Sequence, residues 1–371
     1  MGNQPLSIAI ASGGTGGHFY PTLAIARTAM QAGNEVTVFV AGHHSSEQLE
    51  VARGQGVPAV EVSAIRLPRS CGGLFAFPFR FLASLLEGYK ALGRVRPDVV
   101  LGMGSFASVP ICLAGVLRRK PLVLHEGNSL MGRANRVLSR WARACATSLP
   151  LAEGLAPPCR TVRTGMPLRD AILHAAEPNG ATPAVHGDLG LSADRPTVLV
   201  FGGSQGAEFI NGLLAECVQL LSAECKSVQF IHLTGTDDNA ELQAAYDRAG
   251  IRAVVRRSDP NIERCYLAAG LVVCRGGASS LSELALFGKP AIVIPLPTAA
   301  DDHQTVNARV LSERDALVAV SQAEVTPRDL AERIADWRQT PAAWETRGQR
   351  LHELAAPSAS KAVVDLVLDV V

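Results

Sequence analysis

Two glycine-rich stretches directly follow short apolar runs, and stretches of this kind can bind phosphate groups. Residues 8–11 (Ile-Ala-Ile-Ala) lead into residues 13–17 (Gly-Gly-Thr-Gly-Gly), and residues 198–201 lead into residues 202–206 (Gly-Gly-Ser-Gln-Gly). A glycine-rich turn between a strand and a helix lets backbone N–H groups point at a phosphate, and the helix N-terminus adds partial positive charge. Many α/β proteins use such glycines only for tight packing. Neither stretch matches G-x-G-x-x-G, so an NAD or FAD enzyme is disfavoured.

A third stretch, residues 273–283, predicts a strand, a turn of small residues and a helix that begins near Ser279 or Ser280. The small residues permit close approach of the backbone to a diphosphate. Glu283 lies one turn into this helix, where its carboxylate could accept two hydrogen bonds from a ribose diol. An ordinary first-turn carboxylate, stabilised by the helix dipole, explains Glu283 equally well. The residues alone leave both interpretations open.

Polar side chains gather in residues 301–308 (Asp-Asp-His-Gln-Thr-Val-Asn-Ala), after the apolar run 291–294 and the Pro-Leu-Pro sequence 295–297. Side chains that donate and accept hydrogen bonds suit the hydroxyl groups of a sugar when they follow the carboxyl end of a strand. Asp301 or Asp302 would also cap the following helix. Two adjacent acidic residues without a third ligand do not predict a metal site.

The elements that must position these residues follow from the rhythm of the chain. Short apolar runs alternate with helical patterns, which is typical of a parallel α/β sheet. The pattern changes around residues 164–169 and restarts after Pro196. The sequence therefore predicts two Rossmann-like domains, residues 1–165 and 166–345, and a C-terminal helix, residues 346–371, that could pack back on the N-terminal domain. The expected strands are residues 7–10, 36–40, 98–101, 121–124, 197–201, 230–233, 271–273 and 291–294.

Composition limits the class of protein. The 371 residues are 47% hydrophobic and 19% charged, as expected for compact α/β domains. The formal net charge of +1 argues against a nucleic-acid-binding protein, which needs a surplus of basic residues. The eight cysteines form no C-x-x-C pair, so neither a zinc site nor a disulfide framework is expected. The N-terminal apolar run ends at glycines and no run is long enough to span a membrane, so we expect a cytosolic protein.

Taken in order, the motifs resemble those of the bacterial MurG family. They are Gly-Gly-Thr-Gly-Gly-His (13–18), His-Glu-Gly-Asn (125–128), Gly-Gly-Ser-Gln-Gly-Ala (202–207) and His-Gln-x-x-Asn-Ala (303–308), and the similarity covers essentially the whole chain. Members of this family transfer N-acetylglucosamine (GlcNAc) from UDP-GlcNAc to undecaprenyl-linked lipid I, which gives lipid II of peptidoglycan biosynthesis. The resemblance implies an α/β protein of GT-B architecture, in which two Rossmann-like domains face each other across a cleft. The C-terminal domain would hold most of the donor.

The resemblance also implies roles for individual residues. Ser204 would contact the donor diphosphate and Arg169 would neutralise it, because a planar guanidinium suits oxyanions. Glu283 would bind the ribose, and Asp259 lies nearest the family's uracil contact, in a segment that departs from the usual pattern. No cofactor is expected. The other expected substrate-binding residues are Thr15, Gly16, Gly17, Asn128, Gln205, Ala278, Ser279, Ser280, Leu281, Ser282, His303, Gln304 and Asn307.

Inverting transfer needs a base for the acceptor hydroxyl and stabilisation of the leaving diphosphate. His18 follows the first glycine stretch and is one candidate base, because histidine titrates near working pH. Glu126 is the other candidate. A histidine that caps or supports the helix is the structural alternative for His18. The chain departs from the family pattern at four positions, which affects fine contacts with the acceptor: Ser105, Phe106, Gly127 and Met166.

Residues 66–82 are rich in aromatic side chains, and a long amphipathic stretch is expected from about residue 79 to residue 92. Basic residues beside exposed apolar ones favour an anionic lipid surface, so we expect a peripheral protein on the cytoplasmic face of the inner membrane. A buried helix with a solvated basic edge explains the same pattern. The flanking basic residues are Arg80, Lys90, Arg94 and Arg96.

Other functions fit the same architecture. A non-hydrolysing UDP-GlcNAc 2-epimerase would need acids and bases around the sugar C2, and no such cluster stands out in the sequence. Another GT-B transferase would differ in its acceptor. A regulator that binds a nucleotide sugar without catalysis would need neither His18 nor Glu126, which makes a catalytic protein the better interpretation.

Overall fold

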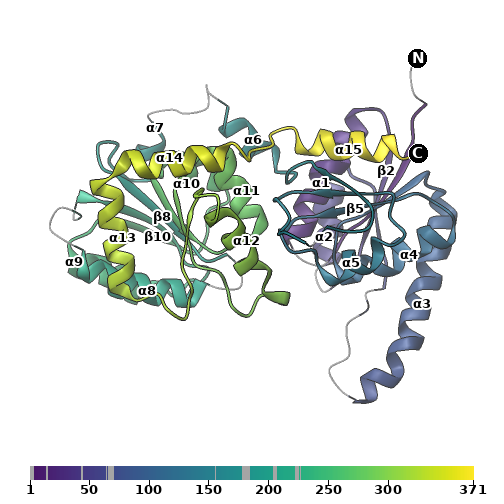
Figure 1. Cartoon of the computed structure of the whole chain (residues 1–371), viewed down its shortest axis with the longest axis horizontal. Helices are drawn as coiled ribbons and strands as arrows, with labels where there is room; N and C mark the ends of the chain where they lie inside the picture. The colour runs from purple at the N-terminus through teal and green to yellow at the C-terminus, as the bar shows by residue number, and fades with distance from the viewer. Residues whose placement is uncertain are drawn as a thin grey trace. The chain divides into compact units, whose positions relative to one another are not determined.

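The computed structural model of the chain describes all residues except 1–3, 14–15, 43–44, 64, 66–70, 155, 178–183, 204–206, 222–224 and 226. The chain divides into two compact units (Figure 1). Unit 1 comprises Met1–Arg169 together with Ala356–Val371, and unit 2 comprises Asp170–Ala355. Thr15, Ser204 and Gln205, all expected in the substrate site, lie outside the described residues.

Unit 1 is built on a seven-stranded sheet in which every neighbouring pair is parallel. Its central strands are buried on both faces, which explains their nearly continuous apolar sequences. The strand order is β3-β2-β1-β4-β5-β6-β7. The strands are β1 (Ser7–Ala11), β2 (Glu35–Val40), β3 (Ala59–Glu61), β4 (Val99–Gly102), β5 (Leu122–Glu126), β6 (Ala144–Thr147) and β7 (Arg160–Arg163).

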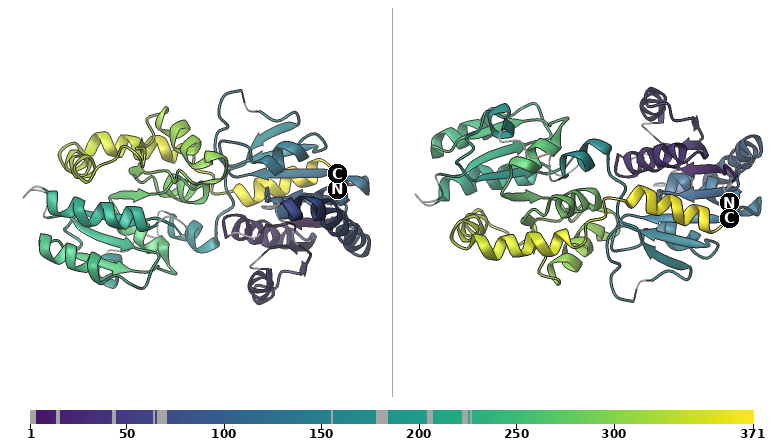
Figure 2. Two further views of the ribbon diagram at one scale, coloured as in Figure 1. Left: turned by 90° about the horizontal axis from the view of Figure 1, so that it is seen from below. Right: turned by 90° about the horizontal axis from the view of Figure 1, so that it is seen from above.

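The C-terminal helix α15 (Ala359–Asp369) completes unit 1 by packing against α1 (Gly16–Gln31). The two helices lie side by side in the views of Figures 1 and 2, where α15 is yellow and α1 is purple. Val363 and Val367 of α15 join the same buried cluster as Phe19 and Leu23 of α1. The other helices of unit 1 are α2 (Ser45–Gly54), α3 (Cys71–Val95), a short 3-10 helix (Phe106–Ser108), α4 (Val109–Leu117) and α5 (Arg133–Leu138).

Unit 2 repeats this architecture with a six-stranded parallel sheet in the order β10-β9-β8-β11-β12-β13. Its first four strands in this order pair as the corresponding strands of unit 1 do. The two sheets thus have the doubly wound arrangement, and the expected fold of two Rossmann-like domains is confirmed. The strands are β8 (Thr197–Phe201), β9 (Gln229–Leu233), β10 (Ala253–Arg256), β11 (Leu271–Cys274), β12 (Ala291–Val293) and β13 (Val318–Ala319).

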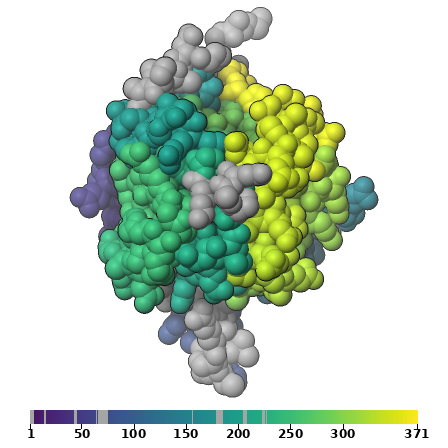
Figure 3. Space-filling view, turned by 90° about the vertical axis from the view of Figure 1, so that its left-hand side faces the viewer, coloured from purple at the N-terminus to yellow at the C-terminus, as the bar shows by residue number. Residues whose placement is uncertain are grey.

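Helices cover the sheet of unit 2, and α8 packs against both α9 and α13. Figure 3 shows α13 and α14, in yellow, covering one flank of unit 2 beside the teal and green surface of earlier elements. The helices are α6 (Asp170–Ala175), α7 (Ala184–Asp188), α8 (Ala207–Leu220), α9 (Ala240–Ala249), α10 (Ile262–Ala268), α11 (Ala278–Phe287), a 3-10 helix (Ala300–Asp302), α12 (His303–Ser312), α13 (Pro327–Gln339) and α14 (Pro341–His352).

The strand order fixes where each unit can bind a ligand. The order reverses direction between β1 and β4 in unit 1, and between β8 and β11 in unit 2. At such a reversal the loops that leave the carboxyl ends of adjacent strands diverge to opposite faces, and ligands bind in the crevice between them. The glycine stretches at residues 13–17 and 202–206 both leave the first strand of this pair.

All eight expected strands are present, and five further strands were not expected: β3, β6, β7, β10 and β13. These five have two to four residues; β3, β7, β10 and β13 lie at a sheet edge, and β6 lies next to one. Short segments such as these carry little periodic signal in the sequence. The amphipathic helix expected over residues 79–92 is present as α3, which begins eight residues earlier, at Cys71.

Candidate active site

Gly13 brings the two loops at the reversal point of unit 1 into direct contact. A Cβ atom at Gly13 would lie 1.8 Å from the Cβ of Ser105, which follows β4, so no other residue fits without moving the loop. The Ser105 Oγ accepts a hydrogen bond from the Ala107 N–H (3.2 Å) and caps the short helix there. Gly16 and Gly17, the last two glycines of the stretch, are exposed and begin the first turn of α1.

His18 lies in the same first turn of α1 and is half-buried. Its backbone carbonyl accepts a hydrogen bond from the Thr22 hydroxyl (2.8 Å), which in turn lies 3.1 Å from the hydroxyl of Ser12. His125, at the end of β5, is close enough for His18 to act on its charge. Burial and the neighbouring His18 lower the pKa of His125 to about 4, so His125 is neutral at physiological pH.

Glu126 is buried, and its carboxylate accepts four hydrogen bonds from the loop that follows β5. The backbone N–H and side-chain amide of Asn128 reach Oε1 at 3.0 and 3.2 Å. The Gly132 N–H and the Asn135 amide each reach Oε2 at 2.9 Å. An ionised carboxylate offers about four lone-pair sites, so these donors occupy them all. Glu126 thereby fixes the loop that carries Asn128.

Arg169 closes the first segment of unit 1 and is half-buried. Its guanidinium carbon lies 5.9 Å from the ring centre of Tyr20, one turn along α1 from Gly16. A cation over an aromatic ring is held in a preferred orientation. The structure thus brings Arg169 to the same helix that carries Gly16, Gly17 and His18.

In unit 2, two side chains of α12 clamp the glycine turn that follows β11. The amide oxygen of Gln304 accepts hydrogen bonds from the N–H groups of Gly276 and Leu296, both at 3.1 Å. The amide nitrogen of Asn307, a fully buried residue, donates to the carbonyl of Gly276 (3.0 Å). A Cβ at Gly276 would lie 2.6 Å from the Gln304 carbonyl oxygen, so the turn requires glycine. The two contacts at the Gln304 oxygen leave its NH₂ group to donate.

The turn leads directly into α11, which begins at Ala278 with Gly277 as its N-cap residue. Ala278, Ser279, Ser280 and Ser282 are half-buried in the first turn and a half. Leu281 is fully buried in the core, so only its backbone could face a ligand. Among the residues after Gly277, this places small side chains on the accessible side of the helix.

Glu283 lies one turn into α11 and is half-buried. Its Oε2 accepts a hydrogen bond from the hydroxyl of Tyr266 (2.8 Å), whose side chain is fully buried. A carboxylate oriented by a buried phenol has a fixed direction, unlike a mobile carboxylate on a helix surface. Burial and the Glu283 carboxylate raise the pKa of Tyr266 well above its usual value, so its hydroxyl remains a donor.

The expected helix cap at Asp301 or Asp302 takes a different form in the structure. Both residues have φ of +54°, the left-handed region, and Asp302 occupies the N-cap position of α12. The Asp302 carboxylate accepts from the hydroxyl of Thr305 (2.6 Å) and makes no hydrogen bond to a helix N–H. His303 is half-buried, and its Nδ1 lies 2.6 Å from the carbonyl oxygen of Ala300.

Asp259 is buried and holds the segment between β10 and α10 together. Its carboxylate contacts Arg264 (2.6 and 3.1 Å), Arg256 (3.3 Å) and the N–H of Asn261 (2.9 Å). Burial alone would raise the pKa of Asp259, but the hydrogen bonds and the charges of the two arginines hold it below the usual value. These contacts occupy the Asp259 carboxylate, so this side chain stabilises the segment between β10 and α10.

A cavity of about 1270 Å³ opens at the carboxyl edge of the unit 2 sheet. It begins at Gly203, beside the second glycine stretch, and extends between α8 and α9 past Thr234 to Arg275 and Leu296. Among the described residues, none of the expected donor-binding side chains lines it. Those on α11 and α12 lie beside the same edge.

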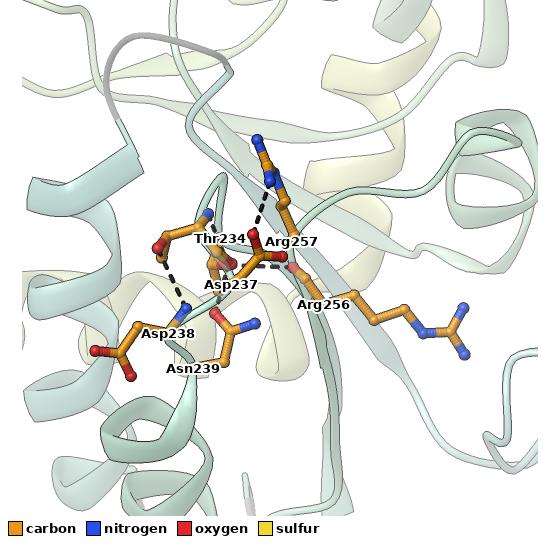
Figure 4. Close-up of polar contacts among 7 residues, drawn as sticks. Thr234, Asp237, Asp238, Asn239, Arg256 and Arg257 are labelled. Carbon is orange, nitrogen blue, oxygen red and sulfur yellow. Dashed lines mark hydrogen bonds and ion pairs between the residues drawn. The ribbon is translucent and has the colours of Figure 1, made fainter.

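Thr234 lines this cavity, and Figure 4 shows it between Asn239 and Arg256. The Thr234 hydroxyl lies 2.6 Å from the Asn239 Oδ1 and 3.2 Å from the Arg256 carbonyl oxygen. Nearby, Arg257 pairs with Asp237 at 2.7 Å on the exposed surface. The loop after β9 is thus tied both to α9 and to β10.

Two residues with a clear place at this edge were not singled out from the sequence. Arg275, directly after β11, is 5% exposed and donates to the carbonyls of Ile294 and Pro295 (3.0 and 3.2 Å). Burial lowers its pKa from the usual arginine value. Tyr266 orients Glu283. Arg275 follows an apolar strand within a turn of small residues, and this pattern could have indicated it. Nothing local in the sequence indicates Tyr266.

The four departures from the family pattern all lie in unit 1. Phe106 stacks against Phe77 of α3, with ring centres 6.4 Å apart. Met166 is buried, and its sulfur lies 3.7 Å from the hydroxyl of Ser148. Ser105 packs on Gly13 as described above, and Gly127 is half-buried. In the described part of the chain no group of three His, Cys, Asp or Glu side chains could hold a metal ion.

Two family models together match most of the chain. Residues 8–147 match the glycosyltransferase family 28 N-terminal domain, and residues 197–363 match the C-terminal domain of the same family. The first match spans β1 to β6 of unit 1, and the second spans all six strands of the unit 2 sheet and the start of α15.

Relatives that are similar in sequence share a single name. The UDP-N-acetylglucosamine–N-acetylmuramyl-(pentapeptide) pyrophosphoryl-undecaprenol N-acetylglucosamine transferase of Syntrophotalea carbinolica is 36% identical over 335 residues, 89% of each chain. That of Verminephrobacter eiseniae is 36% identical over 355 residues, 96% of each chain. The crystal structure of Acinetobacter baumannii MurG superimposes with a TM-score of 0.79 at 27% identity, over 98% of this chain and 100% of that one.

A UDP-GlcNAc 2-epimerase from Neisseria meningitidis also superimposes, with a TM-score of 0.67 over 98% of this chain and 99% of that one. Its sequence is only 13% identical, so this likeness is one of fold alone. It does not favour the epimerase alternative.

Proposed function

The chain belongs to glycosyltransferase family 28 and, within it, to the MurG family, and from this membership we propose that it transfers GlcNAc from UDP-GlcNAc to the muramyl 4-hydroxyl of lipid I. The chain is therefore a glycosyltransferase of GT-B fold. The substrate assignment follows the names of two relatives that are 36% identical over 89% and 96% of each chain. The observation that best supports it is the clamped Gly276 turn, which presents a helix N-terminus and oriented polar side chains at one sheet edge.

The donor binds at the carboxyl edge of the unit 2 sheet. Backbone N–H groups at the start of α11 and the glycine stretch after β8 suit a diphosphate, because both leave strands at the point where the strand order reverses. Glu283, oriented by Tyr266, accepts the ribose hydroxyls. The NH₂ group of Gln304 donates to a GlcNAc hydroxyl, since its oxygen is held by two backbone N–H groups.

His18 is the better candidate for the general base in unit 1. A base needs an unshared electron pair within reach of the acceptor hydroxyl. The four donors around Glu126 occupy its carboxylate, which makes it a positioning residue for the Asn128 loop. The neutral His125 beside His18 adds no charge of its own at physiological pH. Arg169 supplies a permanent positive charge for the leaving diphosphate.

Helix α3 supports binding to a membrane surface. Its apolar side chains at positions 75, 79, 82 and 86 recur at helical spacing and are exposed, with Phe75 at 81% and Phe79 at 77%. Arg80, Lys90 and Arg94 are exposed on the same helix. None of the described helices is long and apolar enough to cross the bilayer. An exposed apolar stripe with basic neighbours suits the surface of an anionic membrane, where the lipid-linked acceptor resides.

Product analysis tests the proposed function. The purified chain is incubated with UDP-GlcNAc, with and without lipid I, and the products are identified by mass spectrometry. We expect UDP release and lipid II formation only when lipid I is present. Conversion of UDP-GlcNAc to its manno epimer without an acceptor would establish the epimerase instead, and UDP binding without either product would establish a regulator.

A further inference from the structure

A series of hydrogen-bonded side chains, which we call the buried chain, lies behind the wall of the unit 2 cavity. It comprises Tyr246, His232 and Asn211. Tyr246 of α9 and His232 of β9 are fully buried, and the Tyr246 hydroxyl lies 3.0 Å from His232 Nδ1. On the other side of the ring, His232 Nε2 lies 3.0 Å from the Oδ1 of Asn211. The Asn211 amide nitrogen then donates to the carbonyl of Thr234 (3.1 Å). Asn211 and Thr234 both line the cavity.

The directions of these hydrogen bonds follow from the last of them. Because the Asn211 nitrogen donates to a carbonyl, its Oδ1 faces His232 and must accept from Nε2–H. Neutral His232 then carries its proton on Nε2, so Nδ1 accepts from the Tyr246 hydroxyl. In this single arrangement the Tyr246 hydroxyl, the His232 N–H and the Asn211 amide each donate to an acceptor. Burial lowers the pKa of His232 to about 3, so the neutral ring required here persists at physiological pH.

Thr234 connects these buried side chains to the end of β10. Its N–H donates to the Arg256 carbonyl (2.8 Å), and the N–H of Gly235 donates to the Arg257 carbonyl (2.8 Å). Figure 4 shows Thr234 beside Arg256 and Arg257. Arg256 and Arg257 begin the segment that leads to Asp259. The buried chain thus fixes both the loop after β9 and the start of the segment after β10.

We propose that Tyr246, His232 and Asn211 are positioning residues that set the affinity for the nucleotide end of the donor. This inference rests on the proposed function, because it takes UDP-GlcNAc as the ligand at this edge of unit 2. Tyr246 and His232 act through Asn211 and Thr234, which hold the Thr234–Gly235 and Arg256–Arg257 backbones in one register. Binding then requires no reorganisation of either loop.

Two substitutions of His232 separate a positioning role from a role in packing. In His232→Gln the amide nitrogen occupies the position of Nε2 and can still donate to Asn211. In His232→Asn the shorter amide reaches only the position of Nδ1, so it keeps Tyr246 and loses Asn211. Tyr246→Phe, which keeps the shape of the ring, removes the other end of the chain.

The measurements are the KM for UDP-GlcNAc, the kcat with lipid I, the Kd of UDP by calorimetry and the Tm. We expect His232→Asn and Tyr246→Phe to raise the donor KM and the UDP Kd together by roughly 3- to 30-fold, with kcat largely retained. His232→Gln, which keeps the hydrogen bond to Asn211 and loses the one to Tyr246, should lose less donor affinity than His232→Asn. A purely structural role would lower the Tm and leave the UDP Kd of the folded protein unchanged.

Each outcome decides the inference. Unchanged UDP Kd in folded His232→Asn and Tyr246→Phe would overturn it, and so would a His232→Gln variant as weak as His232→Asn. If His232→Asn does not fold, Tyr246→Phe decides by the same criterion. Wild type that binds UDP but forms no lipid II would refute the proposed function alone. Wild type that binds no UDP would refute both.

Discussion

Glu126 is the last residue of β5, and His18 lies in the first turn of α1, the helix that follows β1. The two candidate bases differ in what surrounds them. Glu126 is saturated by four donors of its own loop, at 2.9 to 3.2 Å. His18 lies half-buried at the exposed start of α1, beside a neutral His125. A saturated carboxylate stabilises a loop, whereas a histidine at a helix start can exchange a proton with a ligand.

His18→Ala should therefore lower kcat by about 10² to 10⁴, the usual cost of losing a general base, while the UDP Kd stays unchanged. Glu126→Gln should instead lower the Tm, because its NH₂ group would face donors of the Asn128 loop. Steady-state kinetics and thermal unfolding of the two variants check this. A Glu126→Gln enzyme that is inactive at unchanged Tm, beside a nearly active His18→Ala enzyme, would make Glu126 the base.

Glu283 is oriented by the buried hydroxyl of Tyr266, which supports a binding role over that of a mobile first-turn carboxylate. In Glu283→Gln the amide oxygen can keep the Tyr266 contact, which turns the NH₂ group toward the ribose. We expect the KM for UDP-GlcNAc to rise about 10-fold or more, since a hydrogen bond to a charged group contributes roughly 1.5–3 kcal/mol.

The 2′-deoxy analogue of UDP-GlcNAc should lose less in this variant, because it forms only one of the two ribose hydrogen bonds. The ratio of KM values for the two donors, in wild type and in Glu283→Gln, gives the comparison. Equal losses for both donors would show that Glu283 does not contact the 2′-hydroxyl. Tyr266→Phe is the matched control, since it removes the orienting bond and leaves the carboxylate in place.

At the scale of elements, α3 has two unlike faces. Ser84 and Leu92 are buried on the side that packs against α4, and Gly88 allows a close approach to Ile111. On the other side, the side chains of Phe75 and Phe79 are exposed, so folding buries little of their apolar surface. Exposed apolar stripes of this kind mark surfaces that bind another apolar phase.

Replacing both Phe75 and Phe79 by Ser should reduce binding to anionic phospholipid vesicles by about 10-fold or more, because burial of each phenyl ring contributes roughly 1.5–3 kcal/mol. Vesicle flotation measures the bound fraction. Leu220→Ser, at an apolar residue of unit 2 that is 48% exposed, is the control and should not change it. Turnover of a soluble acceptor analogue should persist in the double variant. Equal flotation of the double variant and wild type would assign this face of α3 to another role.

At the scale of the whole molecule, each unit buries, among its described residues, one histidine whose pKa lies far below the usual value. The pKa of His125 in unit 1 falls to about 4 and that of His232 in unit 2 to about 3, in both cases chiefly because of burial. An unfolded histidine titrates near 6.5, so between pH 6.5 and these values the unfolded chain binds more protons than the folded one. The stability contributed by each neutral histidine is complete above pH 6.5 and declines as the pH falls.

We therefore expect the free energy of unfolding to fall by roughly 1.4 kcal/mol per pH unit for each histidine between pH 6 and pH 4.5. Urea unfolding at several pH values measures it. Tryptophan fluorescence follows chiefly unit 2, because Trp337 and Trp344 are buried there whereas Trp141 of unit 1 is 49% exposed. The His232→Gln variant should show a shallower slope in that signal alone. A slope identical to wild type would mean that His232 does not contribute.

The sequence by itself determined the fold class and the order of the motifs. Long buried strands are apolar throughout, so both Rossmann-like sheets were predictable from local pattern, and that the glycine stretches after two of these strands bind phosphate stays a prediction. The family followed from the same motifs. Short strands such as β7 and β13 were not predictable, because two to four residues carry no period and are held by their neighbours in the sheet.

Only the tertiary structure decided what the polar side chains do. Glu126, Asp259 and Asn307 resemble ligand-binding residues in sequence, yet each is buried and held by protein partners. Glu126 accepts from the loop after β5, Asp259 pairs with arginines, and Asn307 donates to the Gly276 carbonyl. Conversely, Tyr266 and His232 lie in apolar segments that give no sign of the partners they orient. Hydrogen-bond partners depend on which strands and helices pack together, and residues 17 to 31 positions apart in the chain meet only after the sheet has formed.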